Sequence, residues 1–285
     1  MVNKNILFDI IKNKLIETVS KFELSKSKKG RKYKYSNLQC INVLLTVLFQ
    51  GCSYRDACLH LEKNAFTSIF KRIQIWESNN LFSDLFTESL NKYKNDNKLN
   101  ILYADSTDIK NICGLNININ YSIKFKSKRA ANLTLLCDDN KIPIIYEISK
   151  ASKKDCNILE DIIVKNNLKL KNKTYIVADK GYFTKKVIRK GYKKRNIILV
   201  LPKKNYNKNK RKLKTKWYKR PRVRHSNKMK HILRNRYKVE NLFARLHKTF
   251  KRLSNLYDKK ITKYKMFIEI AFSALILEHF IQNPK

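Results

Sequence analysis

Thr174-Tyr-Ile-Val-Ala-Asp179, followed by Lys180 and Gly181, is the stretch that decides the fold of this chain. A short run of apolar and β-branched residues leads directly to a carboxylate, and the glycine then interrupts it. This pattern is typical of a short buried strand that ends at an acid. The next acid along the chain is Glu240.

The segment between these two acids is strongly basic. Residues 180–239 contain 25 Lys and Arg and no Asp or Glu, in a chain whose formal net charge is +42. An AT-rich genome explains abundant lysine in general, but it does not explain sixty residues without an acid. The segment therefore predicts a polyanionic partner, most simply the phosphates of a nucleic acid.

The composition excludes a disordered basic tail and argues against a membrane protein. Hydrophobic residues make up 43% of the chain and aromatic residues 11%, which is enough apolar material for a core. The six cysteines show no zinc-ligand spacing, so we interpret them as reduced residues of an intracellular protein. The most apolar segment, residues 266–281, contains two glutamates and is too short to span a bilayer. We expect no membrane partner and a cytoplasmic or nucleoid location, or a nuclear or viral-factory location in a eukaryotic or viral host.

The first part of the chain predicts helices. Gly51 ends an apolar helix, and Ser53 and Asp56 form a capping box that begins the next one. This succession is compatible with a helix-turn-helix and equally with an ordinary helical bundle, since the third helix offers only Lys71, Arg72 and Gln74 as DNA contacts. We expect a helical, helix-turn-helix-like DNA-binding domain over residues 1–97, with helices over 3–23, 37–50, 65–76 and 80–92.

Near residue 99 the spacing of apolar residues changes from the helical pattern to the alternating pattern of strands. A strand over 99–104 is predicted to end at Asp105, and the turn 138–141 between two apolar runs predicts a hairpin. This element order is typical of an α/β fold of the ribonuclease H-like type, a mixed sheet with flanking helices behind a small all-α domain. We assign the catalytic domain to residues 98–285. The remaining expected elements are strands over 117–125, 133–137, 142–148, 174–179 and 196–202, and helices over 158–168 and 184–195.

Three carboxylates are the candidate catalytic groups. Asp105 and Asp179 end strands, and Glu240 lies in a helical pattern over 236–253. Phosphodiester chemistry needs divalent ions that stabilise both the attacking and the leaving oxygen, and carboxylates suit Mg²⁺. Each acid also has a simpler interpretation, as a turn cap, an ordinary strand-end acid, or a partner of Arg236 at i,i+4 spacing. Residues at helical spacing should bury the other side of the Glu240 helix: Val239, Leu242, Phe243, Leu246 and Phe250.

Several motifs together resemble a known family. They are Tyr103-Ala-Asp105-Ser-Thr107, Ala178-Asp179-Lys-Gly181-Tyr182, Arg236-Tyr-Lys-Val-Glu240 and Gly51-Cys-Ser-Tyr-Arg-Asp56. The sequence is similar to the DDE transposases of the bacterial insertion-sequence 4 and 5 superfamily, specifically the insertion-sequence 5-like branch, which is related to the harbinger elements. Two positions of the family signature differ: Leu233 stands at the tyrosine position, and His247 at the lysine position, one residue before Lys248.

The resemblance implies a reaction and a site. Asp105, Asp179 and Glu240 would be the catalytic metal ligands for two Mg²⁺ or Mn²⁺ ions, and Arg236 and Lys248 would hold the DNA end. The implied partners are double-stranded DNA, as terminal inverted repeats and target, and a second copy in a homodimer. The implied reaction is cleavage at transposon ends followed by strand transfer of the 3′-OH into target DNA.

Other candidates and alternatives remain open. We expect further DNA contacts in the basic segment, from Lys180, Arg211, Lys216, Arg220 and Arg222. Trp217 either stacks on an unpaired base or anchors its loop to the core. Asp155 is most simply a helix cap, and Asp108, Asp138 and Asp139 are turn residues. The alternative functions are a nuclease without strand transfer, a catalytically silent DNA-binding descendant of a transposase, and a basic RNA-associated protein.

Overall fold

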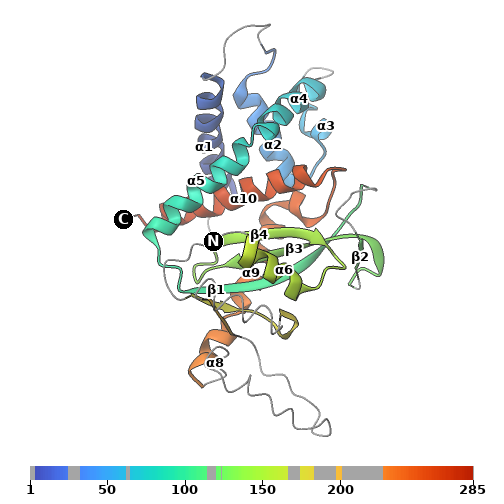
Figure 1. Cartoon of the computed structure of the whole chain (residues 1–285). Coiled ribbons are helices and arrows are strands. Elements are labelled where there is room, and N and C mark those ends of the chain that lie inside the picture. Colours follow the sequence, from blue (N-terminus) through green and yellow to red (C-terminus); the bar gives the residue numbers. More distant parts are fainter. Residues whose placement is uncertain are drawn as a thin grey trace. The chain divides into compact units, whose positions relative to one another are not determined.

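The structure is a computed structural model that describes residues 4–24, 33–61, 65–113, 120–122, 124–165, 174–182, 197–200 and 227–284 (Figure 1). The chain divides into two compact units. Unit 1 comprises Met1–Asn97, Lys110–Asn116 and Arg245–Lys285, and unit 2 comprises Lys98–Ile109 and Ile117–Ala244. The chain therefore leaves unit 1 at residue 97, returns to it briefly at Lys110–Asn116 and joins it again from Arg245, whereas the sequence predicts a single boundary between residues 97 and 98.

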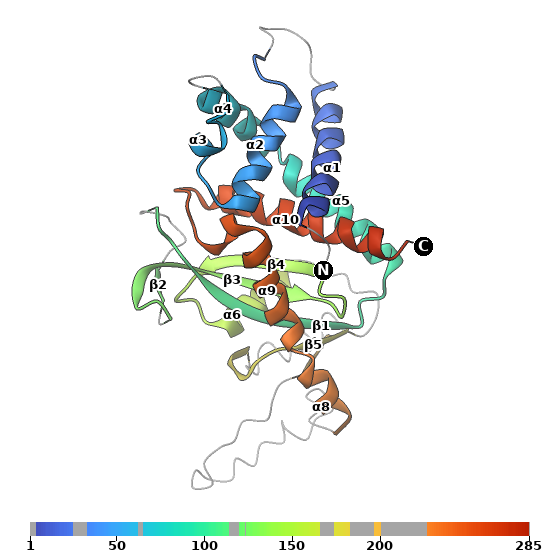
Figure 2. The same ribbon diagram turned by 180° about the vertical axis from the view of Figure 1, so that it is seen from behind.

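Unit 1 is mainly helical. The helices expected in the first 97 residues are present, and the C-terminal segment adds a long one. Within this unit α1 packs beside α2, and α10 packs against α5 and α1 (Figures 1 and 2). The elements are α1 (Lys4–Leu24), α2 (Asn37–Gln50), α3 (Tyr54–Ala57), α4 (Ala65–Ser78), α5 (Leu81–Asp96), η2 (Lys251–Ser254) and α10 (Ile261–Gln282).

Side chains close both ends of α2. Ser36 accepts a hydrogen bond from the Gln39 amide at 3.2 Å, and the Gln39 side chain accepts one from the Ser36 amide at 2.9 Å. At the other end Gly51 adopts φ 75°, and a Cβ there would lie 3.0 Å from Cβ of Lys251. Glycine is therefore required both for the left-handed cap and for the close approach of η2. The predicted capping box of Ser53 and Asp56 is also confirmed.

The apolar C-terminal segment is an internal helix of unit 1. Residues of α10 are buried on nearly all sides, including the carboxylates of Glu269 and Glu278. Glu278 pairs with Arg245, and Glu269 lies 3.7 Å from the ammonium of Lys265. Packing within the unit thus accounts for the hydropathy of α10. Among the helices of the described residues, none is long and apolar enough to cross a membrane.

Unit 2 is built on a mixed sheet. Strands follow the order β2-β3-β1-β5-β6, and β4 also pairs with β3. The β3–β4 hairpin is antiparallel, while β1 pairs with β5, and β5 with β6, in parallel. This is the expected ribonuclease H-like sheet with flanking helices. The elements are β1 (Ile101–Lys110), β2 (Asn120–Ser122), β3 (Ser127–Cys137), β4 (Pro143–Lys150), α6 (Asp155–Lys165), β5 (Thr174–Val177), η1 (Lys180–Tyr182), β6 (Ile197–Val200), α8 (Asn227–Arg234) and α9 (Tyr237–Thr249).

Two of the boundaries that differ from those predicted lie in elements of the candidate site. The first strand does not end at Asp105 but continues to Lys110, because polar side chains such as Asp108 find partners within the sheet. The Glu240 helix ends at Thr249 instead of continuing to residue 253. Phe250 adopts φ −109° and ψ 80° and is followed by the 3₁₀ turn η2. The helix predicted over 184–195 lies outside the described residues.

Helices cover both faces of the sheet. In unit 2, α6 and the first part of α9 lie on opposite faces (Figures 1 and 2). The predicted inner side of α9 is confirmed, because the residues expected there, including Phe250 directly after the helix, are all buried. This burial fixes which side of the helix remains for polar residues, and Glu240 lies on the exposed side. The five buried residues are Val239, Leu242, Phe243, Leu246 and Phe250.

Candidate active site

Asp105 and Asp179 lie on neighbouring strands at the same level. Tyr103 pairs with Val177 in the parallel ladder between β1 and β5. Asp105 lies two residues after Tyr103, still within β1. Asp179 lies two residues after Val177, just beyond the end of β5. Parallel strands run in the same direction, so the ladder brings the two acids to one edge of the sheet.

Arg236 connects two of the three candidate acids. It lies in the turn between α8 and α9, and its Nη1 is 3.4 Å from Oδ1 of Asp179. Its Nη2 is 3.1 Å from Oε1 of Glu240, the i,i+4 pairing that the sequence left open. Both carboxylates are about half exposed, at 52% and 53%, so each pair contributes only about 0–1 kcal/mol to stability.

Asp105 is the more enclosed acid of the site. Its carboxylate accepts a hydrogen bond from the Ser106 amide at 2.9 Å. Burial raises the pKa of Asp105, and the nearby charges of Glu240 and Asp179 raise it further, while the Ser106 amide and Arg236 oppose the shift. The charges of Glu240, Asp179 and Arg236 therefore all act on Asp105 within unit 2.

A second set of polar groups ties the two aspartate-bearing segments together. The Ser106 hydroxyl is hydrogen-bonded to the buried phenol of Tyr182, and it donates to Oδ1 of Asp155 at 3.1 Å. Burial raises the pKa of Asp155, which is the first residue of α6. From the sequence, Asp155 is interpreted as a helix cap, and Ser106 and Tyr182 have no assigned role. The signal in the sequence that could have identified Ser106 and Tyr182 is their proximity to Asp105 and Asp179, respectively.

The donor chemistry of the site fits a hard divalent cation. Three carboxylates offer only oxygen ligands, which Mg²⁺ and Mn²⁺ prefer. Within the described part of the chain, however, no three His, Cys, Asp or Glu side chains are grouped closely enough to hold a metal as they stand. In this arrangement Arg236 pairs with Asp179 and Glu240. Metal binding would therefore require Arg236 to release these acids.

Several predicted DNA contacts fall outside what the structure describes. Lys248 is exposed on α9, and His247 beside it is partly exposed. Lys180 opens η1, but its side chain is not among those described. The remaining candidates of the basic segment lie outside the described residues: Arg211, Lys216, Trp217, Arg220 and Arg222.

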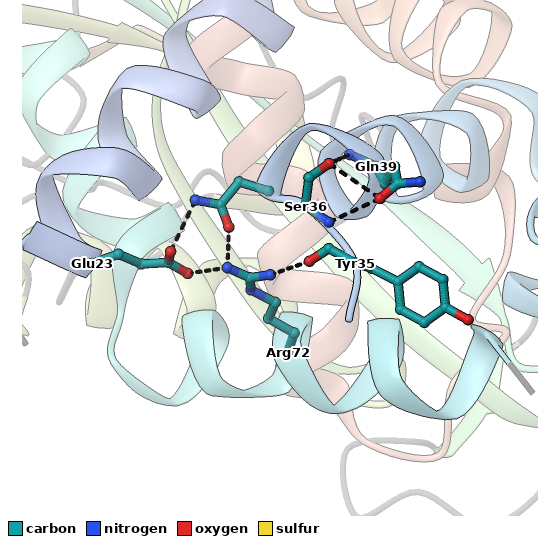
Figure 3. Close-up of polar contacts among 6 residues, drawn as sticks. Glu23, Tyr35, Ser36, Gln39 and Arg72 are labelled. Carbon is teal, nitrogen blue, oxygen red and sulfur yellow. Dashed lines mark hydrogen bonds and ion pairs between the residues drawn. The ribbon is translucent and has the colours of Figure 1, made fainter. Parts of the chain in front are cut away.

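One residue considered for DNA binding by unit 1 is unavailable. Arg72 is 6% exposed and lies within a polar network in the interior of the unit (Figure 3). Its guanidinium donates to the Tyr35 carbonyl at 2.5 Å, to Glu23 at 2.6 Å and to the Asn37 side chain. Arg72 is thus a structural residue, and of the three contacts proposed for a recognition helix only Lys71 and Gln74 remain exposed.

Comparison with known proteins identifies the family. The sequence model of the family described as Transposase DDE domain matches residues 96–276, which is more than half of the chain. Among solved structures, piggyBac transposase in a synaptic complex with hairpin DNA is similar, with a TM-score of 0.56 and 11% identity over 99% of this chain and 76% of that chain. At this identity the likeness shows the fold alone. No curated protein sequence matches.

The family match and the geometry agree. The matched range includes Asp105, Asp179 and Glu240, and the charges of the last two act on the first. The neighbouring structure has the same kind of fold over nearly the whole chain. This chain is a member of the transposase DDE domain family.

Proposed function

We propose that this transposase cleaves DNA at the ends of its element and joins the resulting 3′-OH to target DNA, and that it belongs to the insertion-sequence 5-like branch of the insertion-sequence 4 and 5 superfamily. The observation that carries the proposal is that Arg236 pairs with both Asp179 and Glu240, and that the charges of all three groups act on Asp105. These acids come from a strand, a strand end and a helix that are distant in sequence. An ordinary solvated face gives no reason for acids on three separate elements to converge.

The three acids would hold two Mg²⁺ or Mn²⁺ ions. When bound, such ions stabilise the charge that develops on the attacking and leaving oxygens of a phosphodiester. Asp105, the most enclosed of the three, is held through its own backbone contact with Ser106. Asp179 and Glu240 are half exposed and so have access to both an ion and a DNA phosphate.

Arg236 would have two successive partners. Without DNA its guanidinium neutralises Asp179 and Glu240, which would otherwise repel each other across the site. Once cations neutralise these acids, the guanidinium is free to bind a phosphate of the DNA end, for which its planar donor geometry is well suited. The same residue would thus stabilise the empty site and hold the substrate.

DNA binding would extend along the basic segment and into unit 1. The 25 Lys and Arg of residues 180–239 supply charge for non-specific phosphate contacts. We propose that residues 1–97 contribute to DNA binding, that residues 98–285 carry the catalytic function, and that the chain acts as a homodimer on its terminal repeats and target. The compartment would be that of the element's DNA: the cytoplasm or nucleoid, or the nucleus or a viral factory in a eukaryotic or viral host.

A labelled terminal repeat with a supercoiled target tests this function. Asp105→Asn, Asp179→Asn and Glu240→Gln should each abolish Mg²⁺-dependent cleavage and joining while leaving DNA binding intact, because an amide keeps the shape but loses the charge that holds a cation. The matched control is Asp161→Asn on α6, which removes an ion pair with Lys153 and should remain active.

The alternatives give different results in the same assay. Cleavage without joined products would indicate a nuclease, and binding without cleavage by the unaltered chain would indicate a silent DNA-binding descendant. Near-normal cleavage by any one of the three acid variants would remove that acid from the site.

A further inference from the structure

Two side chains from separate elements of unit 2 contact one carboxylate oxygen, which belongs to a third element. The hydroxyl of Tyr103, on β1, donates to Oδ1 of Asp139 at 2.9 Å. The ammonium of Lys238, on α9, lies 2.7 Å from the same oxygen. It also lies 5.5 Å from the centroid of the Tyr103 ring. Asp139 itself belongs to the turn between β3 and β4, so this cluster joins a strand, a turn and a helix.

The positions of these residues relative to the candidate acids make the cluster informative. Tyr103 precedes Asp105 by two residues on β1, so their side chains lie on the same face of the strand. Lys238 precedes Glu240 by two residues on α9, which places it about 200° around the helix axis and about 3 Å along it. A tether at Lys238 therefore restricts the rotation of the helix that carries Glu240.

Tyr103 also lies near the turn that carries Arg236. Asn235, which directly precedes Arg236, acts on the Tyr103 hydroxyl. The phenol therefore contacts the β3–β4 turn through Asp139 and lies near the α8–α9 turn.

Burial makes the tyrosine a firm anchor. The Tyr103 side chain is fully buried, and Lys238 is only 17% exposed. From this buried position the Tyr103 hydroxyl donates to Asp139. Asp139 is 49% exposed, but two donors on one oxygen restrict its position. The buried phenol thus gives the half-exposed Asp139 one fixed partner.

We propose that Tyr103, Asp139 and Lys238 form a positioning clamp that sets the rotation of α9 and thereby directs Glu240 towards Asp105. The clamp rests on the proposed function, because it presumes that Glu240 is a metal ligand. None of the three residues is placed at the reacting atoms, so they are positioning residues. Asp139, which the sequence suggested was only a turn residue, is the centre of the clamp, and no local pattern links it to Lys238, 99 positions away.

Mn²⁺ binding to the full chain without DNA tests the clamp. Tyr103→Phe and Lys238→Met each remove one contact to Asp139 and keep the size of the side chain. Both should weaken Mn²⁺ binding on the order of 10-fold, the usual effect of removing a partner that orients a ligand. Lys238→Arg keeps the charge and should retain most of the affinity. Free Mn²⁺ is measured by electron paramagnetic resonance, and thermal melting is recorded for every variant.

The control separates positioning from general stability. Asp161→Asn breaks the Lys153–Asp161 pair, which spans 2.6 Å and is partly exposed, in the same unit. It should lower the melting temperature to a similar extent and leave Mn²⁺ affinity unchanged. Equal losses of affinity in the control and in the clamp variants would show that the effect is only one of stability, and would overturn the clamp.

Two further results distinguish failure of the clamp from failure of the proposed function on which it rests. If Glu240→Gln weakens Mn²⁺ binding while Tyr103→Phe and Lys238→Met bind as the unaltered chain does, the clamp is refuted and the proposed function stands. If Glu240→Gln and Asp105→Asn both leave Mn²⁺ binding unchanged, the acids are not the metal site, and the proposed function fails together with the clamp.

Discussion

Replacing Arg236 by methionine should make the candidate site bind a divalent cation more tightly. The guanidinium pairs with Asp179 at 3.4 Å and with Glu240 at 3.1 Å. A cation that uses these carboxylates must displace both pairs. Methionine keeps much of the length of the arginine stem while removing its charge, so the main change is the loss of the competing cation.

The size of the effect follows from the exposure of the pairs. Both carboxylates are about half exposed, and the arginine side chain is 28% exposed. Solvent screening limits each pair to about 0.5 kcal/mol, or about 1 kcal/mol for the two together. This corresponds to a gain of about fivefold in affinity. The gain should shrink at high salt, which screens half-exposed charges.

Mn²⁺ titration of the DNA-free chain measures this gain, and Lys153→Met controls for the loss of one cation elsewhere in unit 2. The same variant should bind a cleaved DNA end more weakly, because the released guanidinium is the proposed phosphate ligand. Weaker Mn²⁺ binding by Arg236→Met would refute the reasoning. It would mean that Arg236 organises the two acids for the metal instead of competing with it.

Three other predictions concern unit 1, the basic segment and the end of α9. Arg72→Met should lower the free energy of unfolding by about 3 kcal/mol in urea titrations, because it removes the guanidinium that donates to Tyr35, Glu23 and Asn37 in Figure 3. Lys71→Met on the exposed side should change it little. DNA affinity in filter binding should fall steeply with salt, and a flat response would contradict phosphate-dominated binding by residues 180–239. Lys248→Ala should weaken binding of cleaved-end DNA more than His247→Ala, and the reverse order would show that histidine holds the phosphate in the family's register.

Most of the fold could be predicted because its signals are local. The helical spacing of α1 and α2, the capping residues Ser36 and Ser53, and the apolar run before Asp179 each lie within a few residues. The hairpin turn is equally local, since Asp138 accepts hydrogen bonds from Asn140 and Ile142. Such patterns depend on neighbouring residues and on the periodicity of helices and strands.

Errors arose where distant partners override local preference. Asp105 looked like the end of a strand because polar residues follow it. Yet Asp108 accepts hydrogen bonds from Ser122 and Asn132, so the polar part of β1 is satisfied within the sheet and the strand continues. Arg72 looked like a solvated helix residue, but its partners Glu23 and Tyr35 come from segments far away in sequence.

The sequence by itself determined the candidate acids, their order along the chain and the element that carries each of them, because residue type and local period are properties of single segments. Only the tertiary structure decided that Arg236 bridges Asp179 and Glu240, and that Asp139 receives both Tyr103 and Lys238. It also decided that the C-terminal helix α10 belongs to unit 1. These outcomes depend on which surfaces pack together, and a contact between residues 36 or 99 positions apart leaves no trace in the local pattern of either segment.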